Sequence, residues 1–290
     1  MAAFEFNDLL RKLEIDPATV LVMRHRPTEK ALRTALPWLA AEQPEVYNAY
    51  QSSHGENVEN SLSRAAWLAS FIGHVPGKAL FVGVYGVRGF RRIDPGRFAR
   101  MPHARVLVEL GSRGPEGRSP LWFDLESTNL LGDYKGRLVI GWPGIERSWW
   151  RRSERNVFPV DAIAEESLLV RRAPQWSSLL IPWAELKVLP SSWRSAIAQW
   201  RGIYYIFDRA SGKGYVGSAC GAENILGRWL GYAATGHGGN QLLKRCNSND
   251  LEFSVLQLLS QDAELPMVIA LENSWKERLH SRVPFGLNSN

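Results

Sequence analysis

Two short apolar runs separated by a glycine-containing turn constrain the fold of this chain more than any other feature. The first run spans residues 202–207 and is rich in Ile, Tyr and Phe, and the second spans residues 215–219. The intervening residues 211–214 include two glycines and allow a tight reversal, so the two runs predict a β-hairpin. Because side chains alternate between the two faces of a strand, the hairpin can place Tyr204 and Tyr215 on the same face.

A helix predicted over residues 222–233 adds a positive charge to this surface. Ile225 and Trp229 are four residues apart and are expected to face the core. Arg228 and Tyr232, also four residues apart, share a different face of the helix. Phenols and a guanidinium without a nucleophile triad suit a phosphodiester substrate, because arginine can bind a non-bridging phosphate oxygen and a phenol can orient or deprotonate a water.

The order of these residues resembles the signature of the GIY-YIG nuclease family. Gly202-Ile203-Tyr204 and Tyr215-Val216-Gly217 resemble its two tripeptides in type and spacing. Three later residues extend the resemblance: Arg228, Glu272 and Asn288. The similarity covers roughly residues 195–290. It implies a small antiparallel three-stranded sheet flanked by helices, one divalent metal ion, and hydrolysis of a DNA strand.

The resemblance also implies a role for each residue of the set. Glu272 would bind one Mg²⁺ or Mn²⁺ ion per active site, since a hard divalent cation needs an oxygen ligand. Arg228 would stabilise charge in the transition state, and Tyr215 would support the water or the phosphate. Asn288 would fix the phosphate or Glu272 by hydrogen bonds.

Two tyrosines are candidates for the general base. Tyr204 is expected to orient the attacking water and is the first candidate. Tyr232 is the second, because it stands where similar sequences carry histidine or tyrosine, and the choice between the two stays open. A phenol with its ordinary pKa of about 10 is a poor base at neutral pH. We therefore expect nearby positive charge to lower the pKa of Tyr204.

Each of these residues has a simpler structural explanation when it is considered alone. Glu272 and Lys276 are four residues apart, which is the spacing of an ordinary ion pair on a helix surface. Tyrosines on neighbouring strands usually pack against each other, and a single exposed arginine is common. Only the complete set, in this order, favours a nuclease over these explanations.

Composition and charge are consistent with DNA as the partner. The 290 residues are enough for about two domains, and a net charge of +6 indicates a polyanionic ligand. Charge alone is weak support, because many basic proteins bind no nucleic acid. The two cysteines form no zinc or disulfide pattern, and no apolar run reaches the ~20 residues of a membrane span. We expect a cytoplasmic protein with no membrane partner.

The first 190 residues are expected to form an α+β domain with a curved sheet. Helical periodicity predicts helices over residues 4–13, 29–41 and 58–72. Apolar runs between glycines and prolines predict strands over residues 20–23, 79–87, 104–110, 121–125 and 137–142. The spacing of Gly83, Gly86 and Gly89 is not that of a phosphate-binding loop, and we interpret them as strand or bulge glycines.

A segment of interleaved aromatic and basic residues, 142–158, is the candidate DNA-binding surface of this domain. Its candidate contacts are Arg147, Trp149, Trp150, Arg151 and Arg152. Arginines neutralise phosphates, and tryptophans stack on bases. The alternative is that the tryptophans cover the sheet while the arginines line a solvated edge. In the C-terminal domain, Lys213 in the turn and His237 in a glycine-rich loop are further candidates for DNA contact.

A junction between two domains is indicated by three prolines: Pro174, Pro182 and Pro190. We expect a DNA-recognition domain over residues 1–190 and a GIY-YIG-like nuclease domain over residues 191–290.

The first hypothesis for the function of the chain is a metal-dependent DNA endonuclease that is restriction-like or modification-dependent. A structure-selective repair or recombination nuclease, and a DNA-binding protein with an inactive nuclease fold, are the alternatives. A double-strand cut needs two sites, which a homodimer or two sequential nicks would supply.

Overall fold

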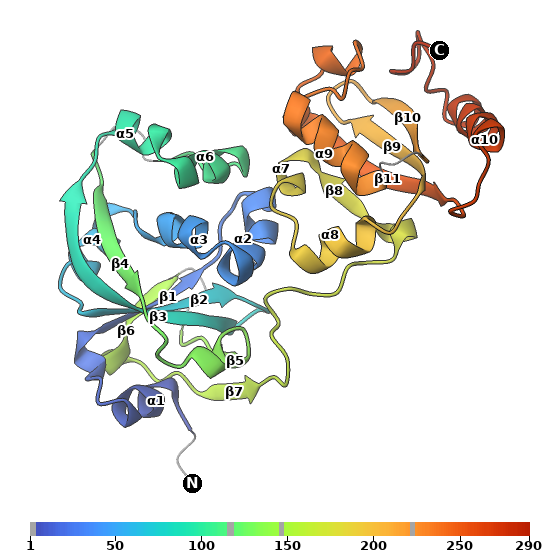
Figure 1. Ribbon diagram of the computed structural model, residues 1–290. Helices are drawn as coiled ribbons and strands as arrows, with labels where there is room; N and C mark the ends of the chain where they lie inside the picture. The colour runs from blue at the N-terminus through green and yellow to red at the C-terminus, as the bar shows by residue number, and fades with distance from the viewer. Residues whose placement is uncertain (1–3, 115–118, 145–147, 221–223) are drawn as a thin grey trace. The chain divides into compact units, whose positions relative to one another are not determined.

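The computed structural model describes residues 4–114, 119–144, 148–220 and 224–290, and the chain divides into two units. The first unit is Met1–Arg171 and the second is Arg172–Asn290 (Figure 1). The division precedes the boundary expected at residue 190, because residues 180–182 form a strand within the sheet of the second unit. Both units combine helices with a sheet, which confirms the α+β class. No helix of the described residues is long and apolar enough to cross a membrane.

Within the described residues, seven strands of the first unit form one sheet. Its order is β6-β1-β2-β3-β5-β7, and β4 pairs with the distal part of β3. β1 and β2 run parallel, and the other strand pairs are antiparallel. The strands are β1 (Val20–His25), β2 (Trp67–Gly73), β3 (Lys78–Arg92), β4 (Leu121–Ser127), β5 (Leu138–Gly141), β6 (Trp150–Arg152) and β7 (Val160–Ile163). The sheet is curved, as expected, and β3 and β4 bend away from the remaining strands (Figure 1).

Helices cover both faces of this sheet (Figure 1). On one face, Phe6 of α1 (Phe6–Lys12) lies in a buried apolar cluster with Val22 of β1 and Ala69 of β2. On the other face, the Tyr47 hydroxyl of α3 (Pro44–Gln51) hydrogen-bonds Ser70 of β2 at 2.8 Å. The remaining helices are α2 (Lys30–Glu42), α4 (Glu56–Leu62), α5 (Pro95–Arg100) and α6 (Pro102–Glu109).

Two sequence-based predictions for the first unit are wrong. Residues 58–72, predicted as one helix, contain the end of α4 and then β2, because pairing with both β1 and β3 outweighs the local helical pattern. Residues 104–110, predicted as a strand, lie largely in α6, which begins at Pro102. The buried residues recur there at helical spacing: Ala104, Leu107 and Leu110.

The glycines of the first unit lie in a strand, as predicted. Gly83, Gly86 and Gly89 are all within β3. The β2–β3 register shifts next to Gly83, and the β3–β4 register shifts between Val87 and Gly89. Such bulges increase the local twist and bend of a sheet.

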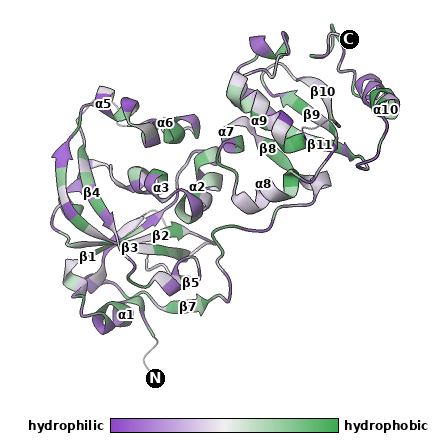
Figure 2. Ribbon diagram, in the orientation of Figure 1, coloured by the Kyte–Doolittle hydropathy of each residue, from purple (hydrophilic) through white to green (hydrophobic). Residues whose placement is uncertain are grey.

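Figure 2 shows hydrophilic and hydrophobic residues alternating along β4, which is typical of a strand with one buried face.

Four described strands form an antiparallel sheet in the second unit, in the order β10-β9-β11-β8. β9 (Gly202–Asp208) and β10 (Lys213–Ala219) form the predicted hairpin, and β11 (Leu251–Leu258) lies on the other side of β9. The expected sheet had three strands. The observed sheet has a fourth, β8 (Leu180–Pro182), because the proline-containing junction pairs with β11 instead of forming a free linker.

The two long helices of the second unit pack on opposite faces of this sheet. Val268 of α10 (Leu265–Arg278) lies in a core cluster with Ile203 and Val216. Trp229 of α9 (Ile225–Thr235) packs edge to face on Tyr204. Ile203 and Tyr204 are neighbours in β9 and therefore point to opposite faces. Two shorter helices are α7 (Trp183–Leu186) and α8 (Ser191–Ile197).

Candidate active site

The hairpin brings two tyrosines together over a glycine. Gly217 is opposite Tyr204 in the β9–β10 register, and the ring centroids of Tyr204 and Tyr215 are 6.5 Å apart. A Cβ atom on Gly217 would lie 2.5 Å from the Tyr204 hydroxyl oxygen and 2.9 Å from the Tyr215 ring. A Cβ atom on Gly202 would overlap the carbonyl group of Gln257 in β11. Close packing therefore requires both glycines, one in each tripeptide.

A third phenol, from α9, completes an aromatic cluster. The hydroxyl oxygens of Tyr232 and Tyr204 are hydrogen-bonded at 3.0 Å, and the Tyr232 ring meets the Tyr215 ring edge to face. Phe253 of β11 packs against both Tyr232 and Trp229. Tyr204 is 0% exposed and Tyr232 is 1% exposed, whereas Tyr215 is half-buried. Of these three phenols, Tyr215 is therefore the one that meets solvent.

Arg228 of α9 supplies the positive charge of this cluster. Its guanidinium interacts with all three tyrosines, chiefly with Tyr204, and this raises the pKa of Arg228 above its ordinary value. The Nε atom of Arg228 is buried and has no hydrogen-bond partner among the described residues. A buried donor without an acceptor costs about 1–3 kcal/mol. An anionic acceptor such as a phosphate oxygen would satisfy it.

Burial, and not the neighbouring positive charge, dominates the titration of the two buried tyrosines. Desolvation raises the pKa of Tyr204 to about 12, with a further rise from Tyr215. Tyr232 and Arg228 act in the opposite direction and lower the pKa of Tyr204. Desolvation also raises the pKa of Tyr232 well above the ordinary phenol value. The expectation of a lowered Tyr204 pKa is therefore wrong, because the loss of water around the phenol outweighs the attraction of one guanidinium.

Glu272 of α10 contacts β10. The Ser218 hydroxyl donates a hydrogen bond to Oε2 of Glu272, and Nζ of Lys276 forms an ion pair with Oε1 at 2.8 Å. Lys276 is 3% exposed, so this ion pair is largely removed from water on the lysine side. Nζ of Lys276 also donates to the side chain of Asn290 at 3.1 Å. The predicted helical ion pair is present, but its lysine is buried.

Glu272 contacts β10 from the α10 side, whereas the tyrosine cluster lies on the α9 side. Ser218 points toward the α10 face of the strand, whereas Tyr215 points toward the α9 face, because they are three residues apart. In the part of the chain that the structure describes, no hydrogen bond or ion pair joins Glu272 to Arg228. The structure thus brings four of the predicted catalytic residues into one contact network: Tyr204, Tyr215, Arg228 and Tyr232.

Asn288 supports the free edge of β10. Its side-chain oxygen accepts a hydrogen bond from the backbone N–H of Val216 at 2.9 Å, and its side-chain nitrogen donates to the Val216 carbonyl at 2.8 Å. Asn288 is 1% exposed. The carboxamide therefore pairs with the strand as a neighbouring backbone would, and it bonds to Val216 instead of Glu272. A contact between Asn288 and a phosphate stays a prediction.

The chemistry of Glu272 fits a single oxygen ligand for a divalent ion. Each carboxylate oxygen has a second lone-pair site beyond the hydrogen bond or ion pair that it already makes. Mg²⁺ is commonly held by one or two carboxylates, with water and substrate phosphate completing the shell. Among the described residues there is no group of three or more His, Cys, Asp and Glu side chains that could hold a metal ion. A metal at this site would therefore take its further ligands from water and from the substrate.

The predicted DNA contacts of the second unit lie on its surface. Nζ of Lys213 donates to the carbonyl oxygen of Pro284 at 2.9 Å, so its charge is placed next to the C-terminal segment. His237 follows α9, and its Nδ1 accepts a hydrogen bond from the Gly239 N–H at 3.0 Å. This bond leaves Nε2 of His237 for another partner.

The described aromatic and basic residues that are predicted to contact DNA in the first unit are neither fully buried nor fully exposed. Trp149, Trp150, Arg151 and Arg152 are all half-buried, and Arg147 lies outside the described residues. Trp149 lies 5.4 Å from the ring of His54 between centroids, and Arg151 donates to the carbonyl of Pro143 at 3.2 Å. Trp142 of the same segment is 6% exposed and belongs to the core. Trp142 therefore matches the structural interpretation, and DNA contact by the other residues of the segment stays a prediction.

No protein-family model matches the chain, and no curated protein is significantly similar to it. Among solved structures, the chain is similar to the catalytic domain of the homing endonuclease I-TevI. The two sequences are 30% identical, and the similarity covers 31% of this chain and 98% of that domain, with a TM-score of 0.27.

The roles of two residues next to the predicted site, Ser218 and Lys276, were not predicted from the sequence. Ser218 directly follows the Tyr-Val-Gly tripeptide, and strand alternation could have placed it on the face opposite Tyr215. Lys276 has the spacing of a surface ion pair with Glu272, and no local signal indicates that it is buried. Both residues hold the carboxylate of Glu272, so they determine what else it can bind.

Proposed function

We propose that the second unit is a metal-dependent DNA endonuclease that hydrolyses phosphodiester bonds. The observation that carries this proposal is the cluster of Tyr204, Tyr215, Tyr232 and Arg228, which collects three phenols and a guanidinium from β9, β10 and α9. Such a cluster suits a substrate with a diffuse negative charge and a water nucleophile. The net charge of +6 favours a polyanion such as DNA.

Arg228 is the residue that binds the scissile phosphate in this proposal. Its buried Nε donor lacks a partner in the described residues, and a non-bridging phosphate oxygen is a strong acceptor for it. The guanidinium stays charged in the cluster, because the ordinary pKa of arginine is far above neutral pH. Negative charge that develops on the phosphate in the transition state is therefore met by a fixed positive charge.

Tyr204 is the better supported of the two candidate bases. Arg228 and Tyr232 both lower its pKa, although burial still holds that pKa at about 12. Every contribution to the pKa of Tyr232 raises it, so Tyr232 is assigned the role of a hydrogen-bond donor to Tyr204. Tyr215 is half-buried and is assigned the role of orienting the attacking water. Glu272 would hold a divalent ion, which when bound would act as a Lewis acid toward a phosphate oxygen.

The first unit is proposed to choose the target. Its half-buried Trp149, Trp150, Arg151 and Arg152 are the proposed DNA contacts, and Lys213 and His237 are proposed to extend the contact in the second unit. Among the possible kinds of target choice, we favour restriction-like cleavage of DNA that carries a modified base. Cleavage of both strands requires a homodimer or two sequential nicks.

A plasmid assay with a matched pair of variants tests this proposal. Supercoiled plasmid is incubated with the purified chain and Mg²⁺, and we expect EDTA and Glu272→Gln each to abolish nicking. Glu277→Gln is the matched control on the same helix, since the Glu277 side chain is 72% exposed and its ion pair with Arg282 contributes little. Retention of full activity by Glu272→Gln, or in EDTA, would contradict the proposed metal role.

The choice of target is tested with modified DNA. Plasmids that carry methylated or hydroxymethylated cytosine are compared with the unmodified plasmid and with branched DNA. Preferential cleavage of a modified plasmid supports the favoured form. Preferential cleavage of branched DNA supports the repair or recombination alternative, and absence of cleavage on every substrate indicates an inactive nuclease fold.

A further inference from the structure

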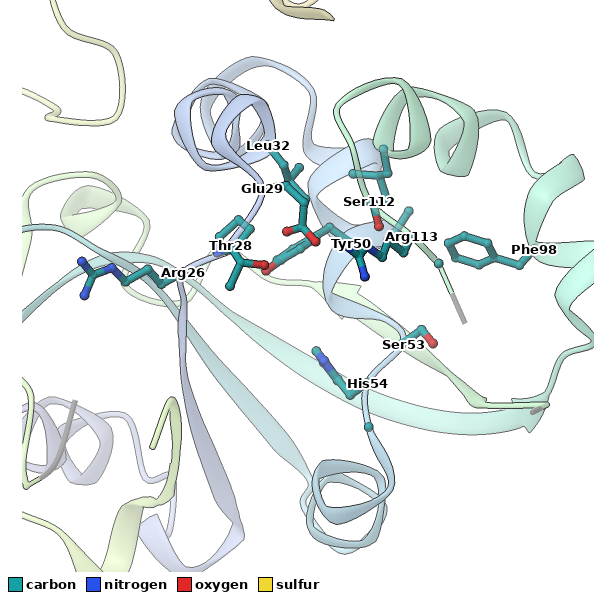
Figure 3. A pocket seen from close by; sticks show the side chains of 15 residues that line it. Arg26, Thr28, Glu29, Leu32, Tyr50, Ser53, His54, Phe98, Ser112 and Arg113 are labelled. Carbon is teal, nitrogen blue, oxygen red and sulfur yellow. The ribbon is translucent and has the colours of Figure 1, made fainter. Parts of the chain in front are cut away.

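A cavity of about 550 Å³ lies in the first unit, next to the end of β1. Its lining comes from the loop before α2 with the start of α2, the end of α3 with the loop that follows, α5, and α6 with the residues after it. Figure 3 shows Glu29, Tyr50 and Arg113 on one side of this cavity and His54 on another, with Phe98 beyond Arg113. A cavity of this size holds a small ligand, since such sites usually occupy about 300–1,000 Å³.

The aromatic side chains of this cavity suit a planar ring. Tyr50 and Phe98 line it together with the imidazole of His54. Behind His54 lie the rings of Trp149, at 5.4 Å between centroids, and His25, at 6.2 Å and nearly parallel. Burial lowers the pKa of His54 to about 4, so the imidazole is neutral near pH 7 and can pack against an uncharged ring. This set of rings can hold an aromatic heterocycle by stacking.

The carboxylate of Glu29 can accept hydrogen bonds from a ligand in the cavity. Glu29 lines it and lies close enough to Tyr50 to raise the pKa of that phenol, in addition to the larger effect of burial. An ionised carboxylate only accepts hydrogen bonds. It therefore selects a ligand that presents N–H donors, such as the exocyclic amino group of cytosine, adenine or guanine. The hydroxyls of Thr28, Ser53 and Ser112 add groups that can donate or accept.

Two arginines line this cavity, and a third arginine lines an adjoining one. Arg113 is exposed and lines the cavity. Arg26 lines both this cavity and an adjoining one of about 290 Å³, whose lining also includes Arg33 and His74. In Figure 3 the Arg26 side chain points away from Glu29 and Tyr50. Arginines in this position can bind a phosphate while the larger cavity takes an uncharged ring.

We infer that this cavity binds a single nucleobase that carries an amino group, with Glu29 accepting from its hydrogen-bonding edge and Arg26 and Arg33 holding the adjacent phosphate. A base inside a duplex is stacked and paired, so it must leave the helix to enter. The same chemistry would also bind a free nucleotide. All of the residues involved lie in the first unit, so the inference does not depend on the proposed nuclease activity of the second unit.

Calorimetry with mononucleotides tests the inference directly. The full chain is titrated with dCMP, dAMP, dGMP and TMP, and we expect at least one amino-bearing nucleotide to bind about tenfold more tightly than TMP. Glu29→Gln is expected to remove this discrimination. Glu166→Gln, at an exposed position of the same unit, is the control and is expected to leave it unchanged. Circular dichroism of each variant separates loss of binding from loss of folding.

A DNA titration identifies the source of the base. Glu272→Gln protein is mixed with matched duplexes and with duplexes that contain one mismatched cytosine or adenine, since extrusion of a mismatched base costs less. Tighter binding of a mismatched duplex that Glu29→Gln abolishes supports an extruded base. Binding of mononucleotides without this preference supports a free nucleotide as the ligand. Absence of both kinds of binding, or affinities that Glu29→Gln leaves unchanged, would overturn the inference.

Discussion

At the scale of single residues, the candidate site depends on a glycine that lets two tyrosine rings meet. Any side chain at Gly217 would collide with the Tyr204 hydroxyl and the Tyr215 ring. Strand alternation predicted that these tyrosines share a face, because that pattern is local. The pKa of Tyr204 was not predictable in the same way, since its rise reflects burial by rings such as those of Trp229 and Tyr232, which come from later parts of the chain.

Gly217→Ala is expected to disrupt the cluster. The added methyl group must displace Tyr204 or Tyr215, so we expect a loss of about 1–3 kcal/mol in the free energy of unfolding and a loss of DNA cleavage. Urea unfolding and plasmid nicking measure the two effects. Gly231→Ala is the matched control, because its Cβ meets nothing within 4 Å and alanine favours a helix. If Gly217→Ala and Gly231→Ala had equal free energies of unfolding and equal rates of cleavage, the close approach at Gly217 would not be needed for stability or activity.

The pH dependence of cleavage tests the assignment of Tyr204 as the base. A base must be deprotonated to act, and the deprotonated fraction rises about tenfold per pH unit below the pKa. Since burial raises the pKa of Tyr204 to about 12, we expect the single-turnover rate to keep rising between pH 6.5 and pH 9. The Tyr204→Phe variant should cleave DNA slowly, and its rate should no longer rise with pH. A slope that persists in Tyr204→Phe would assign the titration to another group.

At the scale of elements, β10 is the strand on which the site is built. It carries Tyr215 toward α9, Ser218 toward α10, and its edge is paired with Asn288. The hairpin was predictable from two apolar runs and a turn, because its contacts are close in sequence. The position of α10 was not, because it depends on packing of Val268 against residues more than fifty positions earlier in the chain.

The same limit explains the two wrong element assignments in the first unit. The sequence before β2 has apolar residues at helical spacing, and only the presence of β1 and β3 on either side makes residues 67–73 a strand. A single-sequence pattern contains no information about these partners. Residues 104–110 differ for another reason: their apolar content favours a strand, whereas Pro102 just before them begins a helix.

From the contact between α10 and β10 we predict that Lys276 lowers the affinity of Glu272 for a metal ion. Nζ of Lys276 already neutralises Glu272, and a unit charge at about 4 Å is worth ~1 kcal/mol even in water. We therefore expect Lys276→Met to bind Mn²⁺ about fivefold more tightly than the wild type, or better, and Glu272→Gln to lose Mn²⁺ binding. Calorimetry with Mn²⁺ alone measures both. Weaker binding by Lys276→Met would show that the lysine organises the site and does not compete with the ion.

At the scale of the whole molecule, two units with different chemistry share one chain. The second unit gathers phenols, a guanidinium and a carboxylate around one hairpin, and the first unit contains a cavity lined by rings, one carboxylate and peripheral arginines. The sequence indicated an aromatic and basic recognition surface over residues 142–158. It did not indicate the cavity, whose lining extends from residue 26 to residue 114 and is assembled only by the fold.

The most direct test of the central claim is the single-turnover cleavage of supercoiled plasmid by wild-type protein, Arg228→Ala and Arg209→Ala in the presence of Mg²⁺. We expect Arg228→Ala to lose about 100-fold or more in rate, as for loss of one group that stabilises transition-state charge. Arg209→Ala should cleave like the wild type, because Arg209 is an exposed residue in a surface ion-pair network. Cleavage by Arg228→Ala at the wild-type rate would contradict the account, since the phosphate would then be bound elsewhere.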